Sequence, residues 1–315
     1  MPKDREFTAV ILAASEGDNL YPLTEELPPA FLTVANRPLL SYQIEMIENA
    51  GGFYDAILVA HQRYMPRLVK YIADEYKGSL KLHAFAVDDD ADSADALRQL
   101  KPRLTTNDVV VIAADAICDV AFQQLADLHR LQSSAVTVLF KECAPRAPTD
   151  KKKARDLDGA DFVGLDRKGK RLIYLESAAD CDDDVLAVSE SMLRSYPHLR
   201  IHSDLADAHV YIFARWTLDV LETKPHFGSL KFELLPYLVR KQFLLQSNLP
   251  TRRMERVHSA VAPGAGGAAG TAGEGEHASA LAMSACKGPR TSHATTFPCC
   301  CYLLPHSGAY CMRAS

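Results

Sequence analysis

The sequence has no run of about 18 consecutive apolar residues, the length that a helix needs to cross a bilayer. Its first residues, MPKDREFTAV, carry charges and then enter a short apolar run, without the longer apolar segment of a secretory signal. We therefore expect a cytoplasmic protein, located in the cytosol, that has no membrane partner.

Cysteine is scarce over most of the chain, because only Cys118, Cys143 and Cys181 precede residue 280 and they lie far apart. This spacing fits neither a disulfide framework nor a zinc site. Residues 299–301 are three adjacent cysteines, but no CxxC or HxxxH pair accompanies them. We therefore expect no metal in either part of the chain.

Positive charge is not in excess, since 35 Lys and Arg stand against 40 Asp and Glu and the net charge is −5. Such a balance argues against binding nucleic acid through overall electrostatics. One basic run occurs at residues 151–155, between proline-containing and Asp-rich stretches. We interpret this run as a solvated loop rather than a nucleic-acid contact, and expect no direct nucleic-acid partner.

Short apolar runs alternate with amphipathic segments through most of the chain, which indicates βαβ units. The expected strands cover residues 7–14, 56–60, 80–85, 108–114, 135–140, 161–166, 171–176 and 208–214, and the expected helices cover residues 39–50, 63–76, 94–100, 122–131 and 230–243. This order predicts an α/β fold with a mostly parallel, Rossmann-like sheet and helices on both faces.

The composition changes at about residue 254. The stretch VAPGAGGAAGTAGEGEHASALAMSAC is rich in Gly and Ala and lacks the bulky periodic residues that pack a core. We therefore expect one domain over residues 1–253 and a disordered, Gly/Ala- and Cys-rich tail over residues 254–315.

The first predicted strand leads into a segment laid out like a nucleotide-binding loop. The segment resembles the frame of the sugar-1-phosphate nucleotidyltransferase superfamily, in which LAAGxGTRL is followed by PxT, PKxxxPV and PL. The matching positions are Leu12, Ala13, Ala14, Leu20, Pro22, Leu23, Thr24, Pro28, Val34, Pro38 and Leu39. The resemblance implies the nucleotidyltransferase-like fold.

The residues that would bind phosphate within this frame are missing. Ser15 and Glu16 stand where the family has paired glycines, and only Gly17 is kept. Asn19 takes the place of the family's arginine, and Pro29 takes the place of its lysine. Glycines let backbone N–H groups approach a phosphate, and cations offset its charge. We therefore expect no bound nucleotide or other cofactor at this degenerate loop.

The family's second nucleotide-contact segment, GTAxAL, corresponds to residues 92–97, where Asp92 and Ser93 replace its first two residues. Asp115 matches the family's metal-binding aspartate, and one carboxylate can help to hold magnesium beside phosphates. Without a phosphate cradle, we interpret Asp115 as a vestigial metal ligand. Asp115 and Asp119 are then polar strand-end and helix-cap residues, and we expect no catalytic residue.

Several segments also resemble the gamma subunits of eukaryotic translation initiation factor two B. They are AVDDDAD at residues 86–92, DFVGLD at 161–166, GKRL at 169–172, DAHVY at 207–211 and ELLPYLVRKQF at 233–243. The last of these is the most specific, and the resemblance covers residues 7–245. Family members continue into hexapeptide repeats, which are absent from this sequence, so we expect a chain truncated before the β-helix.

The resemblance implies a non-catalytic regulatory subunit of a guanine-nucleotide exchange complex. Its partners would be the epsilon subunit, which carries the exchange activity, the other subunits of the complex, and initiation factor two. The alternative is a sugar-1-phosphate nucleotidyltransferase, either active or regulatory, which would release pyrophosphate in a magnesium-dependent reaction. His209, a lone histidine in an apolar strand, is interpreted as a hydrogen-bonded structural residue rather than a ligand.

Overall fold

The computed structural model of the chain describes residues 6–14, 20–25, 27–143, 161–177, 186–243 and 297–304, together with the backbone of Cys311–Arg313. The chain divides into two compact units, one made of Met1–Gln242 and Phe297–Ser315 and the other of Phe243–Thr296. The first unit holds every described residue except Phe243. Within these ranges, every helix is too short or too polar to cross a bilayer.

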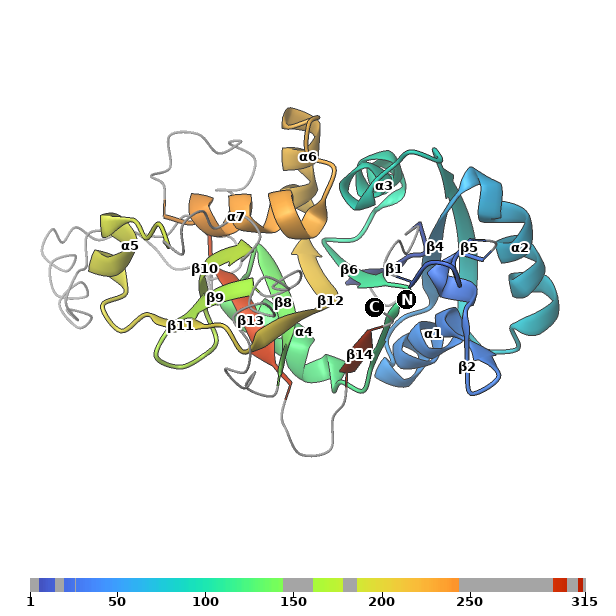
Figure 1. Ribbon diagram of the computed structural model, residues 1–315, viewed down its shortest axis with the longest axis horizontal. Helices are drawn as coiled ribbons and strands as arrows, with labels where there is room; N and C mark the ends of the chain where they lie inside the picture. The colour runs from blue at the N-terminus through green and yellow to red at the C-terminus, as the bar shows by residue number, and fades with distance from the viewer. Residues whose placement is uncertain are drawn as a thin grey trace, which may run out of the picture. The chain divides into compact units, whose positions relative to one another are not determined.

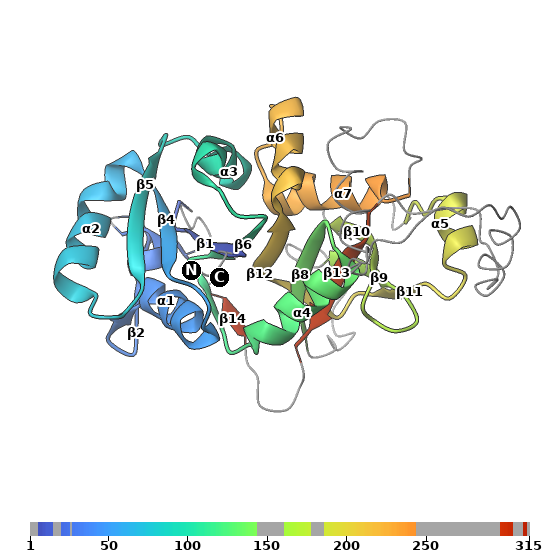
Figure 2. The ribbon, with the colours of Figure 1, turned by 180° about the vertical axis from the view of Figure 1, so that it is seen from behind.

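A seven-stranded sheet forms the centre of the first unit, with strand order β13-β8-β12-β6-β1-β4-β5 (Figures 1 and 2). Its strands are β1 (Phe7–Leu12), β4 (Asp55–His61), β5 (Lys81–Val87), β6 (Asp108–Ala113), β8 (Val136–Glu142), β12 (Leu205–Ala214) and β13 (Cys299–Leu303). β1 pairs in parallel with β4 and β6, and β4 pairs in parallel with β5. β12 runs antiparallel to its neighbours β6 and β8. The prediction of a mostly parallel sheet is confirmed.

Helices lie on both sides of this sheet, as the alternating pattern predicted. In both views α1 and α4 lie on one side, and α3, α6 and α7 lie on the other (Figures 1 and 2). The helices are α1 (Leu39–Ala50), α2 (Met65–Lys70), α3 (Ser93–Leu100), α4 (Phe122–Gln132), α5 (Glu190–Ser195), α6 (Asp219–Thr223) and α7 (Leu235–Lys241). α5 and α6 were not predicted, because each is too short to show a helical period.

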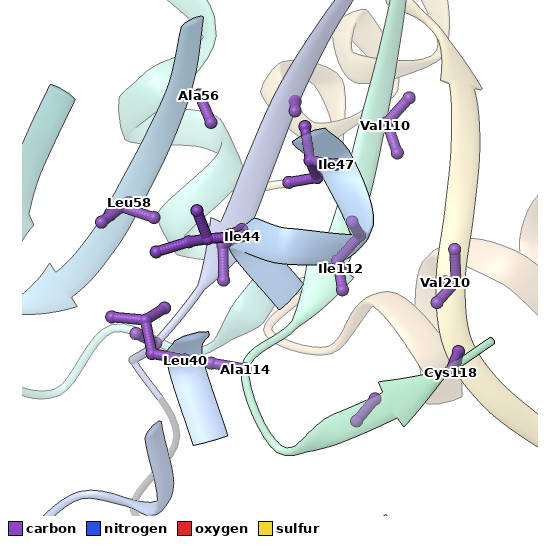
Figure 3. Packing of buried hydrophobic residues seen from close by; sticks show 14 of the residues in the cluster. Leu40, Ile44, Ile47, Ala56, Leu58, Val110, Ile112, Ala114, Cys118 and Val210 are labelled. Atoms are coloured by element: carbon purple, nitrogen blue, oxygen red, sulfur yellow. The ribbon is translucent and has the colours of Figure 1, made fainter. Parts of the chain in front are cut away.

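Helix α1 shows how the pattern of the sequence forms the core. Leu40, Ile44 and Ile47 follow one another at helical spacing, are buried, and face the sheet residues Leu58 and Ile112 (Figure 3). Pro38 precedes the helix, and Gly51 ends it with a positive φ of 67° that a residue with a side chain rarely adopts. The helix is thus fixed against β1, β4 and β6 before any ligand is considered.

A three-stranded sheet with the order β10-β9-β11 stands beside the seven-stranded sheet. Its strands are β9 (Asp161–Leu165), β10 (Leu172–Ser177) and β11 (Arg200–His202). β9 and β10 form an antiparallel hairpin, and Asp166 Oδ1 holds its turn by accepting hydrogen bonds from the backbone N–H groups of Lys170 and Arg171 at 2.8 and 2.9 Å. Gly169 supplies a positive φ of 66° within this turn.

Strand β13 differs from the disorder expected beyond residue 254. Cys299–Leu303 pairs in parallel with β8, and all three of its cysteines are buried. Phe297 packs edge-on against Trp216, with ring centroids 5.1 Å apart. Compositional reasoning missed the strand because the apolar run is short and follows a long Gly/Ala-rich stretch. Residues 244–296 lie outside the described residues, so the domain boundary at residue 253 stays a prediction.

Four shorter strands complete the described structure. They are β2 (Thr33–Val34), β3 (Arg37–Pro38), β7 (Ala116–Cys118) and β14 (Cys311–Arg313). β2 pairs with β3, and β14 pairs antiparallel with β7, directly after Asp115. The two strands of the expected tail that the structure describes, β13 and β14, therefore pair with β8 and β7 of the same unit.

Replacing Ile44 with alanine tests the core. The Ile44→Ala substitution removes a fully buried side chain, so we expect the free energy of unfolding to fall by about 2–5 kcal/mol in urea denaturation. Leu131→Ala is the matched control, because Leu131 is 80% exposed on the surface of α4 and its loss should change stability by less than about 0.5 kcal/mol. Equal effects of the two substitutions would contradict this description of the core.

Shortening the chain tests β13. A chain that ends at residue 296 loses the buried residues of β13 and exposes the edge of β8, so its unfolding midpoint should fall by at least about 4 °C. A chain that ends at residue 304 keeps β13 and removes β14, which separates the two contributions. The same midpoint for both shortened chains would mean that β13 adds nothing to the sheet.

Candidate functional site

The carboxyl ends of β1 and β6 lie at one edge of the sheet, and ligands of α/β proteins usually bind beyond such an edge. Leu12 and Ala113 are paired in register, and the N–H of Ala114 donates to the carbonyl of Leu12 at 3.0 Å. Asp115 follows at once, and only 6% of its surface is exposed. The structure places Asp115 at this edge as expected, while its role as a vestigial metal ligand stays a prediction.

Gln43 of α1 fixes the turn that carries Asp115. Its Nε2 donates to the carbonyl of Ala114 at 3.1 Å and also to the carbonyl of Ala116. Because one buried side chain holds both flanking carbonyls, the turn is fixed relative to α1. Asp119, in contrast, is exposed and does not cap α4, whose N-cap is Ala121. The helix-cap interpretation of Asp119 is wrong, because the chain runs two residues further before the helix begins.

The phosphate-loop positions Ser15, Glu16, Gly17 and Asn19 lie outside the described residues, so the expectation that they bind no cofactor stays a prediction. Pro29 is described, and it opens a short 3₁₀ helix (Pro29–Phe31) in which all three residues are buried. A buried proline presents neither a cation nor an N–H group to a phosphate. Among the described residues, no three His, Cys, Asp or Glu side chains group as metal ligands would.

The N-terminus of α3 corresponds to the family's second nucleotide-contact segment, at which the sequence predicted no bound nucleotide. Asp92 is the N-cap residue, but its side chain makes no capping hydrogen bond. The Ala94 N–H donates to the Gly228 carbonyl at 2.8 Å, and Ser93 Oγ accepts from the Leu230 N–H at 3.0 Å. The segment 228–230 of the same chain therefore uses an N–H group and a hydroxyl of the first turn.

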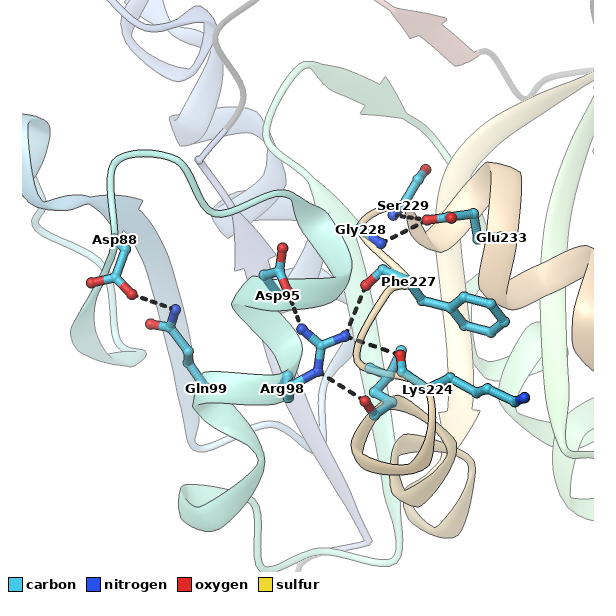
Figure 4. A network of polar contacts seen from close by, with 10 residues as sticks. Asp88, Asp95, Arg98, Gln99, Lys224, Phe227, Gly228, Ser229 and Glu233 are labelled. Carbon is cyan, nitrogen blue, oxygen red and sulfur yellow. Dashed lines mark hydrogen bonds and ion pairs between the residues drawn. The ribbon is translucent and has the colours of Figure 1, made fainter.

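Arg98 holds this contact closed from the other end of α3 (Figure 4). Its Nε donates to the Leu221 carbonyl at 2.9 Å, and its Nη2 donates to the Phe227 carbonyl at 2.8 Å. Its Nη1 pairs with Asp95 on the same helix. One guanidinium thus joins α3 to the chain that leaves α6, and carbonyl oxygens bonded to a charged donor are held more strongly than by a neutral one.

The segment 228–230 is also rigid in itself. Glu233 Oε2 accepts hydrogen bonds from the N–H groups of Gly228 and Ser229 at 2.6 and 2.8 Å (Figure 4). Ser229 Oγ accepts from the Phe232 N–H at 3.2 Å, in the manner of a reciprocal helix cap. A side chain at Gly228 would bring its Cβ within 2.8 Å of Asp92 Oδ2. A residue with a side chain at position 228 would therefore require the exposed Asp92 side chain to move.

A pocket of about 490 Å³ opens on the same side of the molecule as α7. It is lined by Asp161, Leu175, Glu176, Ser177, Asp207, Phe227, Lys231, Phe232, Glu233, Pro236, Tyr237 and Arg240. Lys231 Nζ lies 3.0 Å from Asp161 Oδ2, and the Asp161 side chain is only 2% exposed. Burial raises the pKa of the Asp161 carboxyl above its ordinary value; the Lys231 ammonium acts against the rise, and the Asp207 carboxylate adds to it.

Asp207 is held in this pocket by an irregularity in β12. The pairing of β12 with β8 shifts between Asp207 and Tyr211, and His209 between them has a positive φ of 56°. Asp207 accepts from the His209 N–H at 2.8 Å and from the Tyr211 hydroxyl at 2.6 Å. The His209 N–H therefore helps to hold Asp207, and the His209 ring lies 6.3 Å from the Tyr211 ring, centroid to centroid.

Sequence reasoning missed this pocket. Its charged residues come from β9, β10, β12, α7 and the helical segment Leu230–Leu234 before α7, so no single stretch of sequence contains the group. The signal that was present is local: Lys231 interrupts an apolar run, and Asp161 opens a buried strand. A buried charge of either sign predicts a partner of opposite sign. The sequence pattern does not say which residue that partner is.

Comparisons with known proteins agree with this architecture. Residues 8–150 match the family described as Nucleotidyl transferase. The chain is 31% identical over 255 residues to "Translation initiation factor eIF2B subunit gamma" of Dictyostelium discoideum, which covers 75% of this chain and 58% of that protein. It is 32% identical over 135 residues to a mannose-1-phosphate guanyltransferase of Candida albicans, which covers 41% of this chain and 36% of that protein.

A solved Bacillus anthracis chain assigned as a glucose-1-phosphate thymidylyltransferase superposes with a TM-score of 0.58 at 13% identity, covering 81% of this chain and 94% of that one. This likeness shows the fold alone. The chain spans just over half the length of the gamma subunits that it matches. The match to those subunits extends well beyond the match to the guanyltransferase. The chain is therefore a nucleotidyltransferase-like α/β protein related to the gamma subunits of translation initiation factor eIF2B.

Proposed function

We propose that the chain is a non-catalytic subunit of an eIF2B-type complex. In this role it supports exchange of GDP for GTP on translation initiation factor two, while the epsilon subunit carries the exchange activity. The observation that supports a non-catalytic role most directly is the hydrogen bond from the Ala94 N–H to the Gly228 carbonyl. It places the chain's own backbone at the start of α3, where the related transferases would contact a nucleotide.

The chemistry of nucleotidyl transfer supports the same proposal. Transfer requires cations and N–H donors aimed at charge that develops on the phosphates. Pro29 is buried and offers neither, and the carboxylate Asp92 stands at the start of α3 where the family has glycine. A domain that acts through its surfaces can lose such donors without loss of its core, because core packing and site chemistry use different residues.

A second candidate is a sugar-1-phosphate nucleotidyltransferase, active or regulatory. It is favoured by Asp115, which stands at a parallel strand end and is held there by Gln43. The match of residues 8–150 to the Nucleotidyl transferase family also favours it. An active form of this candidate requires a donor set for the triphosphate, which the described residues Pro29 and Asp92 do not supply.

Co-expression tests the proposed function. The full chain is produced with the epsilon-type subunit of the same organism, purified through a tag on the chain, and assayed for GDP release from initiation factor two. We expect the epsilon-type subunit to co-purify and GDP release to be faster than with that subunit alone. The Ile44→Ala variant, which should be destabilised, serves as the control for a contact that needs the folded domain.

A chain that folds but purifies alone, and that releases pyrophosphate from GTP and mannose 1-phosphate with magnesium, would contradict the proposal in favour of the second candidate. Loss of that turnover in an Asp115→Asn variant would then assign the metal-binding role to Asp115.

Replacing Arg98 tests whether α3 is closed by the chain itself. Arg98→Ala removes the donors to the Leu221 and Phe227 carbonyls, so hydrogen exchange at the amides of Ala94 and Leu230 should become faster by about tenfold or more. Arg103→Ala is the control, since Arg103 is exposed and stacks on Phe85 instead. Unchanged exchange in Arg98→Ala would mean that the contact does not depend on the guanidinium.

A further inference from the structure

The pocket beside α7 carries more acid than base. Its four carboxylates, from Asp161, Glu176, Asp207 and Glu233, face two cations, from Lys231 and Arg240, which leaves an excess of two negative charges. A concave site with an excess of one sign concentrates field and favours ligands of the opposite sign. A phosphate group would therefore be repelled from this pocket, and a cation would be attracted.

The two cations of the pocket are already engaged. Lys231 pairs with Asp161 at 3.0 Å, and Arg240 pairs with Glu176 at 3.3 Å. Asp207 and Glu233 accept hydrogen bonds from backbone N–H groups, and Asp207 also accepts one from a tyrosine hydroxyl. These bonds hold the two carboxylates in place without removing their charge. The excess negative charge is therefore carried by positioned groups.

Aromatic rings complete the lining. Phe227 and Tyr237 pack edge to face with centroids 5.4 Å apart, and Phe232 adjoins them on the helical segment before α7. The Lys231 ammonium lies 5.2 Å from the centre of the Phe232 ring. Ring faces attract cations, and carboxylates with aromatic faces form the usual environment of a bound guanidinium.

Phe232 is 52% exposed at this pocket. Exposed aromatic residues beside a charged recess are typical of protein interfaces, in which the ring packs against the partner while the recess takes one side chain. We propose that this pocket receives an arginine side chain of a partner protein, with its guanidinium between the carboxylates and Phe232 packed against the partner's backbone. The existence of such a partner rests on the proposed function, while the preference of the pocket for a guanidinium does not.

Small probes test the pocket without a partner. The full chain is titrated with N-acetyl-arginine amide, with the neutral isostere N-acetyl-citrulline amide, and with the anion glucose 1-phosphate, and binding is followed by NMR of the aromatic rings. We expect the arginine probe to bind at least about tenfold more tightly than the citrulline probe, because only the first carries the charge. Tighter binding of glucose 1-phosphate than of the arginine probe would overturn the proposal.

Variants assign the preference to named residues. Glu233→Gln keeps an acceptor for the backbone N–H groups but removes a charge, so affinity for the arginine probe should fall by about threefold or more. Glu190→Gln is the matched control, since Glu190 is exposed on α5 and does not line the pocket. Phe232→Ala, at an exposed position, gives a second variant should Glu233→Gln fail to fold. An arginine probe that binds both pocket variants as tightly as the unchanged chain would contradict the assignment.

The partner is tested on the co-expressed complex. Phe232→Ala should reduce co-purification of the epsilon-type subunit or of initiation factor two at least about threefold, whereas Leu131→Ala, which changes an even more exposed apolar residue elsewhere, should not. If the arginine probe binds but neither partner co-purifies, the pocket's preference for a guanidinium is supported and the proposed function is contradicted. Retention of both partners by Phe232→Ala would place their contacts elsewhere and overturn the proposed occupant.

Discussion

The contact between the first turn of α3 and the segment 228–230 joins two distant parts of the chain at the N-terminus of the helix. Its hydrogen bond from Ala94 to the Gly228 carbonyl is short, and Arg98 supports it through carbonyls of the chain that leaves α6. A Cβ at position 228 would require the Asp92 side chain to move. A helix N-terminus is a ready-made anion site only while its N–H groups are free. Here the Ala94 N–H bonds to the Gly228 carbonyl of the same chain, so this N–H group serves the packing of the domain.

The rest of the candidate site also combines the backbone geometry of a ligand-binding edge with a lack of charged donors among the described residues. The strand ends of β1 and β6, the turn held by Gln43 and the carboxylate of Asp115 all keep the geometry of a ligand-binding edge. Pro29 is packed in the interior instead of carrying a charge to that edge. Packing and catalysis make separate demands on a sequence, because a core requires volume and apolar surface, whereas a phosphate site requires donors at exact places. The pocket beside α7, in contrast, is lined by six charged side chains.

Local patterns predicted much of the fold and less of the sites. α1 follows from its apolar spacing, its leading proline and its closing glycine, and the position of Asp115 follows from the strand that ends before it. β13 escaped prediction because its pairing with β8 joins residues more than 150 positions apart, and composition carries no record of such a contact. The pair of Asp161 with Lys231 escaped for the same reason. The contact at α3 also includes Arg98, which bonds to carbonyls more than 120 positions away. The sequence shows only an arginine on a polar helix face, so this role could not be predicted.

The proposed non-catalytic role requires that this domain does not hold a nucleotide for transfer. The most direct measurement is equilibrium binding of magnesium–GTP to the full chain by calorimetry, with hydrogen exchange at the Ala94 amide recorded in the same mixtures. We expect no saturable heat at millimolar nucleotide and no change in hydrogen exchange at the Ala94 amide. Saturable binding in the micromolar range that displaces segment 228–230 and exposes the Ala94 amide would contradict this expectation. The N-terminus of α3 would then be a ligand site that segment 228–230 covers only while the ligand is absent.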